Sequence, residues 1–65
     1  MKLKQLLKHF WHGASTIESV VIYRMHTILA ELDDYRLANA DYGGFDNDSV
    51  SIFLIEGDKL KVWLK

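Results

Sequence analysis

The chain lacks cysteine and proline, and only four of its 65 residues are glycine. Without cysteine it can form no disulfide framework, no thiolate metal site and no cysteine nucleophile. Long apolar runs are also missing, because lysines interrupt residues 1–9. A secretory signal needs roughly 7–15 consecutive apolar residues and a membrane span about 20. We therefore expect a cytoplasmic protein with no membrane partner.

The length and composition indicate one small folded domain, residues 1–65. A chain of this size buries only about 60 % of the surface that it exposes when unfolded. Its hydrophobic content of 49 % excludes intrinsic disorder. Eight basic and nine acidic side chains give a net charge of −1. This balance argues against a globally basic nucleic-acid binder, so we expect no direct nucleic-acid partner.

The N-terminal residues predict an amphipathic helix over residues 2–11. Its large apolar residues recur every three or four positions, which places them on one stripe of a helix. Gly13 follows where a helix C-cap is expected. The apolar stripe consists of Leu3, Leu6, Leu7, Phe10 and Trp11.

Residues 15–40 admit two interpretations. Ser15 and Glu18 have the spacing of a capping box, and no glycine, proline or asparagine interrupts residues 14–38, which favours one long helix. The β-branched run 20–22 instead favours two strands over 17–24 and 27–32. Met25 and His26 would then form the turn, although neither residue favours a positive φ.

The C-terminal residues predict an antiparallel β-hairpin over 50–64. Gly57-Asp58 suits a two-residue turn with glycine first, and this register sets Glu56 opposite Lys59. The fold class is therefore α+β, with element order ααββ or, on the strand interpretation, αββββ. One face of the hairpin carries Phe53, Ile55, Leu60, Val62 and Leu64, and the other carries Val50, Ile52, Leu54 and Trp63.

The second hairpin face is too apolar to remain bare in water. Helices, further strands or a second protein chain could cover it. If a second copy does so, we expect Ile52 and Trp63 to mediate self-association as a homodimer.

The acidic residues are concentrated in the middle of the chain. Residues 31–58 hold eight of the nine acidic side chains and a single basic one, Arg36. This block could be a solvated loop, or it could dock onto a basic protein surface by mimicking nucleic-acid phosphates. A calcium loop is a poorer match, because Val50 stands at a ligand position. The predicted partner-binding residues are Glu31, Asp33, Asp34, Asp41, Tyr42, Phe45, Asp46 and Asp48.

The sequence carries no recognisable catalytic motif. His9 and His12 have a spacing that could serve a metal ion, but nothing identifies a third ligand, so we expect ordinary surface histidines. No nucleophile elbow surrounds any serine, and Gly43-Gly44 is not part of a phosphate-binding loop. We therefore predict no catalytic residues, no metal, no cofactor and no enzyme activity.

The layout resembles that of short accessory proteins carried by bacteriophages and mobile elements of Gram-positive bacteria. The shared pattern is a Met-Lys-Leu-Lys-Gln-Leu-Leu start, the segment 20–23, an acidic middle and a final hairpin. It spans most of the chain but contains no diagnostic motif, so no functional residue is transferred. The resemblance implies an inhibitor of host machinery, for example of CRISPR nucleases, that uses an acidic, DNA-like surface. It also favours the strand interpretation of residues 17–32, which would give one helix on a four-stranded antiparallel sheet. The alternative function is a self-associating interaction module.

Overall fold

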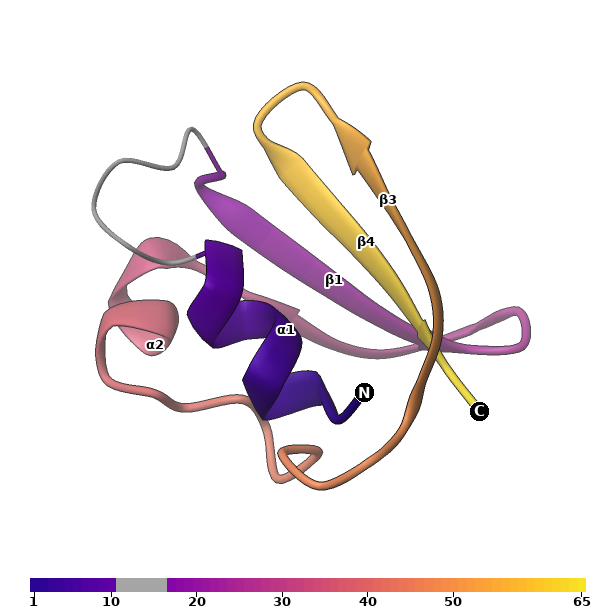
Figure 1. Ribbon diagram of the computed structural model, residues 1–65. Helices are drawn as coiled ribbons and strands as arrows, with labels where there is room; N and C mark the ends of the chain where they lie inside the picture. The colour runs from indigo at the N-terminus through magenta and orange to yellow at the C-terminus, as the bar shows by residue number, and fades with distance from the viewer. Residues whose placement is uncertain (11–16) are drawn as a thin grey trace.

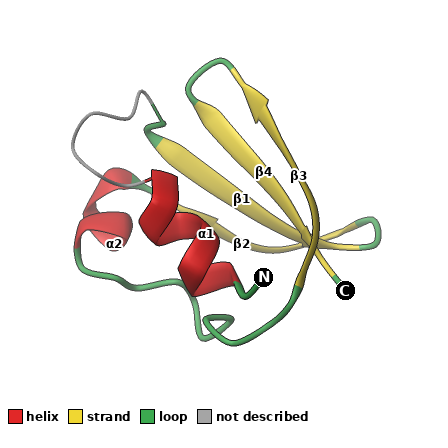
Figure 2. Ribbon diagram, in the orientation of Figure 1, coloured by secondary structure: helices red, strands yellow, loops and turns green. Residues whose placement is uncertain are grey.

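The structure, a computed structural model, describes residues 1–10 and 17–65. A four-stranded sheet carries two helices on one of its faces (Figures 1 and 2). No helix in the described ranges is long and apolar enough to cross a membrane. In chain order the elements are α1 (Leu3–Phe10), β1 (Ser19–Arg24), β2 (Thr27–Leu32), α2 (Asp34–Ala38), β3 (Val50–Glu56) and β4 (Lys59–Leu64).

The sheet is mixed, with strand order β2-β1-β4-β3. Each outer strand pairs antiparallel with its inner neighbour, and the two inner strands, β1 and β4, run parallel. Val20, Val21 and Ile22 are all buried. β1 is paired with a neighbouring strand at both of its edges, and its β-branched residues suit this central position.

The strand interpretation of residues 17–32 is correct, and the long helix over 15–40 is wrong. Met25 and His26 connect β1 to β2, and Met25 adopts a φ of 55°. Cross-strand packing of the β-branched residues of β1 therefore outweighs an unfavourable turn residue. Ser15, on which the capping box depended, lies outside the described residues.

The αββββ prediction needs two corrections. The sheet is not fully antiparallel, and a second helix, α2, lies between β2 and β3, so the order is αββαββ. Residues 33–49 lead the chain from one edge of the sheet, past the start of α1, to the opposite edge (Figure 1). The second hairpin consequently joins β1 through β4, and this pairing is parallel.

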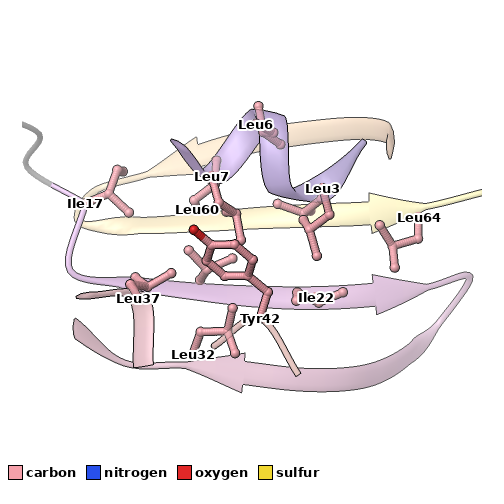
Figure 3. Packing of buried hydrophobic residues seen from close by; sticks show 12 residues of the cluster. Leu3, Leu6, Leu7, Ile17, Ile22, Leu32, Leu37, Tyr42, Leu60 and Leu64 are labelled. Carbon is pink, nitrogen blue, oxygen red and sulfur yellow. The ribbon is translucent and has the colours of Figure 1, made fainter. Parts of the chain in front are cut away.

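The predicted N-terminal helix is present over Leu3–Phe10, while Trp11 and Gly13 lie outside the described residues. Its leucines pack on the sheet together with Leu37 of α2 and Tyr42, so both helices cover the same face (Figure 3). The buried core cluster consists of Leu3, Leu6, Leu7, Ile17, Val20, Ile22, Leu32, Leu37, Tyr42, Leu60, Val62 and Leu64.

The loop before β3 closes the N-terminus of α1. The N–H of Leu3 donates to the carbonyl of Asp48 at 2.9 Å, and the N–H of Lys4 donates to that of Asp46 at 3.0 Å. The Gln5 side chain accepts from the N–H of Lys2 at 2.9 Å. These bonds satisfy backbone donors that a helix cannot satisfy internally.

The predicted C-terminal hairpin is confirmed. Glu56 pairs with Lys59, and Gly57 takes the positive φ of 65° that a two-residue turn with glycine first requires. One residue differs from expectation: a bulge between Val50 and Ile52 turns Val50 onto the core face, where it packs against the cluster. A bulge inserts one extra residue, here Ser51, so the residue before it points to the opposite face of the sheet from the one expected.

Candidate interaction surface

The structure separates the acidic residues that the sequence groups together. Glu31, Asp33, Asp34 and Asp41 lie around α2, whereas Asp46 and Asp48 lie in the loop beside the start of α1. Arg24 at the end of β1 donates to Asp48, with 2.9 Å between Nη2 and Oδ2. The predicted acidic docking face is therefore not one continuous surface.

Arg36 connects α2 to the loop that follows it and to the end of β2. Its Nε lies 3.2 Å from Oδ2 of Asp41, and its Nη1 donates to the backbone carbonyl of Glu31 at 3.2 Å. The N–H of Gly43 donates to the same Asp41 carboxylate at 3.2 Å. The Arg36 hydrogen bond, followed by that from Gly43, lowers the pKa of Asp41. Asp41 thus has a structural partner within its own chain.

Tyr42 and Phe45 do not form an exposed aromatic pair. Tyr42 is only 5 % exposed and belongs to the core, where Figure 3 shows its ring between Leu37 and Ile22. Burial, and secondarily the charge of Asp46, raise the pKa of its hydroxyl. Phe45 is half-buried against the same cluster. The expectation that Tyr42 contacts a partner is therefore corrected: the ring fills the space between helices and sheet.

Three acidic side chains remain exposed at the junction of β2 and α2, and we call Glu31, Asp33 and Asp34 the acidic end. Asp33 caps α2, because its Oδ1 accepts from the N–H of Arg36 at 2.8 Å. Oδ1 of Asp34 accepts from the N–H of Tyr35 at 2.8 Å. Both residues are nonetheless exposed to solvent.

No group of three or more His, Asp or Glu side chains in the described ranges could hold a metal ion. His9 lies exposed at the last turn of α1, where its ring meets Phe10 edge-on with centroids 5.4 Å apart. His12, the other half of the proposed pair, lies outside the described residues.

The sheet face opposite the core carries an apolar row across all four strands. In the described part of the chain neither helix covers this open face. Tyr23 and Trp63 stack at its centre, with ring centroids 4.8 Å apart and planes 12° from parallel. The strand pairings define the apolar row as Ile28, Tyr23, Trp63 and Ile52, on β2, β1, β4 and β3 in turn.

A second row lies beside the first on the open face. It runs from Glu31 through Val21 and Lys61 to Leu54. Lys61 is neutralised by Glu56, with Nζ 3.1 Å from Oε2. Glu31 therefore brings the negative charge of the acidic end onto the border of the apolar row.

Ile52 and Trp63 lie side by side on this face as predicted from the hairpin register. Tyr23 and Ile28 were not identified, because their role depends on β1 and β2 being strands. The alternation of Tyr23 with the buried Ile22 is the pattern of a strand, but over so short a run it did not exclude the helical interpretation.

Comparison of the chain with protein-family models, with curated proteins and with solved structures yields no match.

Proposed function

We propose that the protein is a small, non-catalytic protein-binding module whose contact surface is the apolar row of the open face. The observation that carries this proposal is the exposure of large apolar side chains at both ends of the row, Ile28 at 54 % and Ile52 at 62 %. Contiguous apolar patches on a small protein mark interaction surfaces. Tyrosine and tryptophan, which stack at the centre, are also enriched among residues that dominate binding energy.

The chemistry of the border indicates the kind of partner. Glu31 stands next to the row on β2, and Asp33 and Asp34 follow it, while Lys61, two residues from Trp63, is already paired with Glu56. A complementary surface would have an apolar centre with arginine or lysine on the side that meets β2. We therefore propose a protein partner with a basic border.

A second candidate function is the phage-type inhibitor that inserts carboxylates into a basic, nucleic-acid-binding groove. The exposed acidic end favours it, because its three carboxylates cluster and have no lysine or arginine side chain paired to them. Asp41 and Asp48 contribute less to such a surface, since arginines of the same chain bind both. The acidic end would then be the main contact and the apolar row the border.

One binding experiment separates the two functions. Immobilised protein is exposed to a lysate of the organism that encodes it, at low and at high salt. The face variant is Ile28→Lys, and its matched control is Thr27→Lys, which adds the same charge at a neighbouring exposed residue of β2. The acidic-end variant combines Glu31→Gln, Asp33→Asn and Asp34→Asn, which removes charge and keeps an Asn cap on α2.

The apolar-row proposal predicts a retained protein that resists high salt, binds the Thr27→Lys control and is lost with Ile28→Lys. Binding that persists in Ile28→Lys would refute it. The inhibitor would be supported instead if binding is lost at high salt and in the acidic-end variant while Ile28→Lys still binds. Exposed charge pairs are screened by salt, which explains the first of these effects.

A further inference from the structure

Exposed apolar side chains are concentrated on one edge strand. Ile52, Phe53, Leu54 and Ile55 are 62, 41, 50 and 48 % exposed, and they are four consecutive residues of β3. They alternate between the two faces of the sheet, so cover on the open face alone would leave Phe53 and Ile55 exposed. The feature that all four share is the free edge of β3.

The two edges of the sheet differ in how they are protected. On β2 a register shift leaves Leu29 as an extra residue, and Glu31 places a charge in the strand. Bulges and charges are common devices against edge-to-edge pairing. At the start of β3, Met1 and Lys2 cover the edge, because the N–H of Val50 donates to the carbonyl of Met1 at 2.8 Å and Lys2 pairs with Ser49. Between its bulge at Ser51 and Glu56, β3 carries neither device.

The hairpin register shows which backbone groups of β3 lack a partner in the sheet. In a two-residue hairpin the residues that flank the turn, here Glu56 and Lys59, exchange hydrogen bonds, and bonded pairs then alternate along the ladder. Leu54 and Ile52 are therefore bonded to β4. The N–H and C=O groups of Phe53 and Ile55 point away from β4, toward the free edge.

We propose that β3 pairs antiparallel with β3 of a second copy, about a two-fold axis at Leu54. The residues whose backbone groups face outward then meet one another: Phe53 of each copy pairs with Ile55 of the other. The central pair places Leu54 beside Leu54 of the second copy on the open face. This register uses only the edge between the bulge and the turn, and the two-fold axis makes the contact self-complementary.

Charge supports a second copy as the occupant. Glu56 is the only charged residue of β3. The two-fold axis sends the two Glu56 residues to opposite ends of the paired strands, each beside Ile52 of the other copy, so like charges never meet. On the helix face, Phe53 already contacts Phe10, with ring centroids 5.6 Å apart, and Ile55 of the second copy would pack beside this aromatic pair.

The pairing would produce one continuous sheet of eight strands from the two copies. Their open faces would lie on the same side, and the second rows of the two copies would meet at Leu54. This proposal goes beyond the protein partner proposed above and does not depend on it.

The first test uses the wild-type protein at increasing concentration. Sedimentation should show a monomer–dimer equilibrium, and amide exchange measured by NMR should slow at Phe53 and Ile55 as dimer forms. A strict monomer at all concentrations would overturn the proposal. So would a dimer in which these two amides exchange as fast as in the monomer, because that pattern indicates association through the open face.

The second test removes an outward donor. Ile55→Pro deletes an N–H that the ladder with β4 does not use, and edge strands tolerate proline at such positions. We expect it to raise the dimer dissociation constant at least about tenfold, because two symmetry-related hydrogen bonds are lost. The control Ile55→Ala also loses the side chain but keeps the N–H. Equal weakening in both variants would refute the strand pairing. If Ile55→Pro fails to fold, the wild-type amide exchange still decides.

Discussion

Two residues other than glycine hold a positive φ in the described ranges, Met25 at 55° and Ala40 at 54°. Met25 is the first residue of the β1–β2 turn. Ala40 follows α2, where its N–H donates to the carbonyl of Leu37 and that of Asp41 donates to Arg36. This bond pattern is the Schellman motif, which normally has glycine at the left-handed position. Both sites therefore carry local strain that the surrounding hydrogen bonds impose.

Met25→Gly should stabilise the protein. An L-residue in the left-handed region costs roughly 1–2 kcal/mol, and the extra chain entropy of glycine offsets about 0.5–1 kcal/mol of that. Met25 is exposed, so no packing is lost. We expect the unfolding free energy from urea titration to rise by about 0.5–1 kcal/mol. His26→Gly, beside it but without a positive φ, is the control and should not stabilise. A lower urea midpoint for Met25→Gly than for wild type would contradict the strain argument.

At the scale of elements, predictability from the sequence follows the locality of each signal. The period of the leucines in α1 and the Gly57-Asp58 turn are local, and both elements formed where expected. The β1–β2 hairpin was left open, because Met25 and His26 give no turn signal. The parallel pairing of β1 with β4 depends on the path of residues 33–49, which no local pattern encodes.

The short helix α2 escaped prediction because its five residues, Asp34–Ala38, are too few to display a helical period. Its start does carry a signal, since Asp33 is a preferred N-cap residue. We instead predicted that Asp33 binds a partner, because it belongs to the acidic block of the sequence. The apolar row was half predicted, through Ile52 and Trp63, because only the C-terminal hairpin had a secure register.

Asp33→Ala and Asp33→Asn should separate the capping role from the charge. Alanine removes the bond from the N–H of Arg36 and should lower the unfolding free energy by about 1 kcal/mol. Asparagine accepts the same bond without a charge, so its stability should stay within a few tenths of a kcal/mol of wild type. Urea unfolding of both variants at neutral pH measures the difference. If the two variants lose equal stability, the contribution of Asp33 is charge and not capping.

At the scale of the whole molecule, the chain path relieves the repulsion within the acidic block. Asp48 meets Arg24 from the first hairpin, and Asp41 meets Arg36 from α2, so two carboxylates are offset by arginines on separate elements. Both pairs are partly exposed, and such pairs contribute roughly 0–1 kcal/mol each. Their consequence is mainly spatial, since they leave Glu31, Asp33 and Asp34 as an exposed acidic cluster beside the apolar row.

Tyr42 connects the pH response of the molecule to its core. Its hydroxyl has a raised pKa, first because the ring is buried among both helices and the sheet, and second because Asp46 is nearby. In the unfolded chain the same group titrates near its ordinary value of 10.0. The folded state therefore holds this proton more tightly, and the resulting stability is complete below pH 10.0 and is lost as the pH rises through the folded value.

Tyr42→Phe should consequently flatten the alkaline loss of stability. Phenylalanine keeps the ring in the core but has no proton to lose. Urea unfolding at pH values from neutral to strongly alkaline should show the wild-type free energy falling more steeply than that of Tyr42→Phe above the unfolded pKa of tyrosine. Tyr35→Phe is the matched control, because Tyr35 is 74 % exposed, and its curve should parallel wild type. Parallel curves for wild type and Tyr42→Phe would mean that other groups cause the alkaline unfolding, and that the Tyr42 hydroxyl reaches solvent without opening the core.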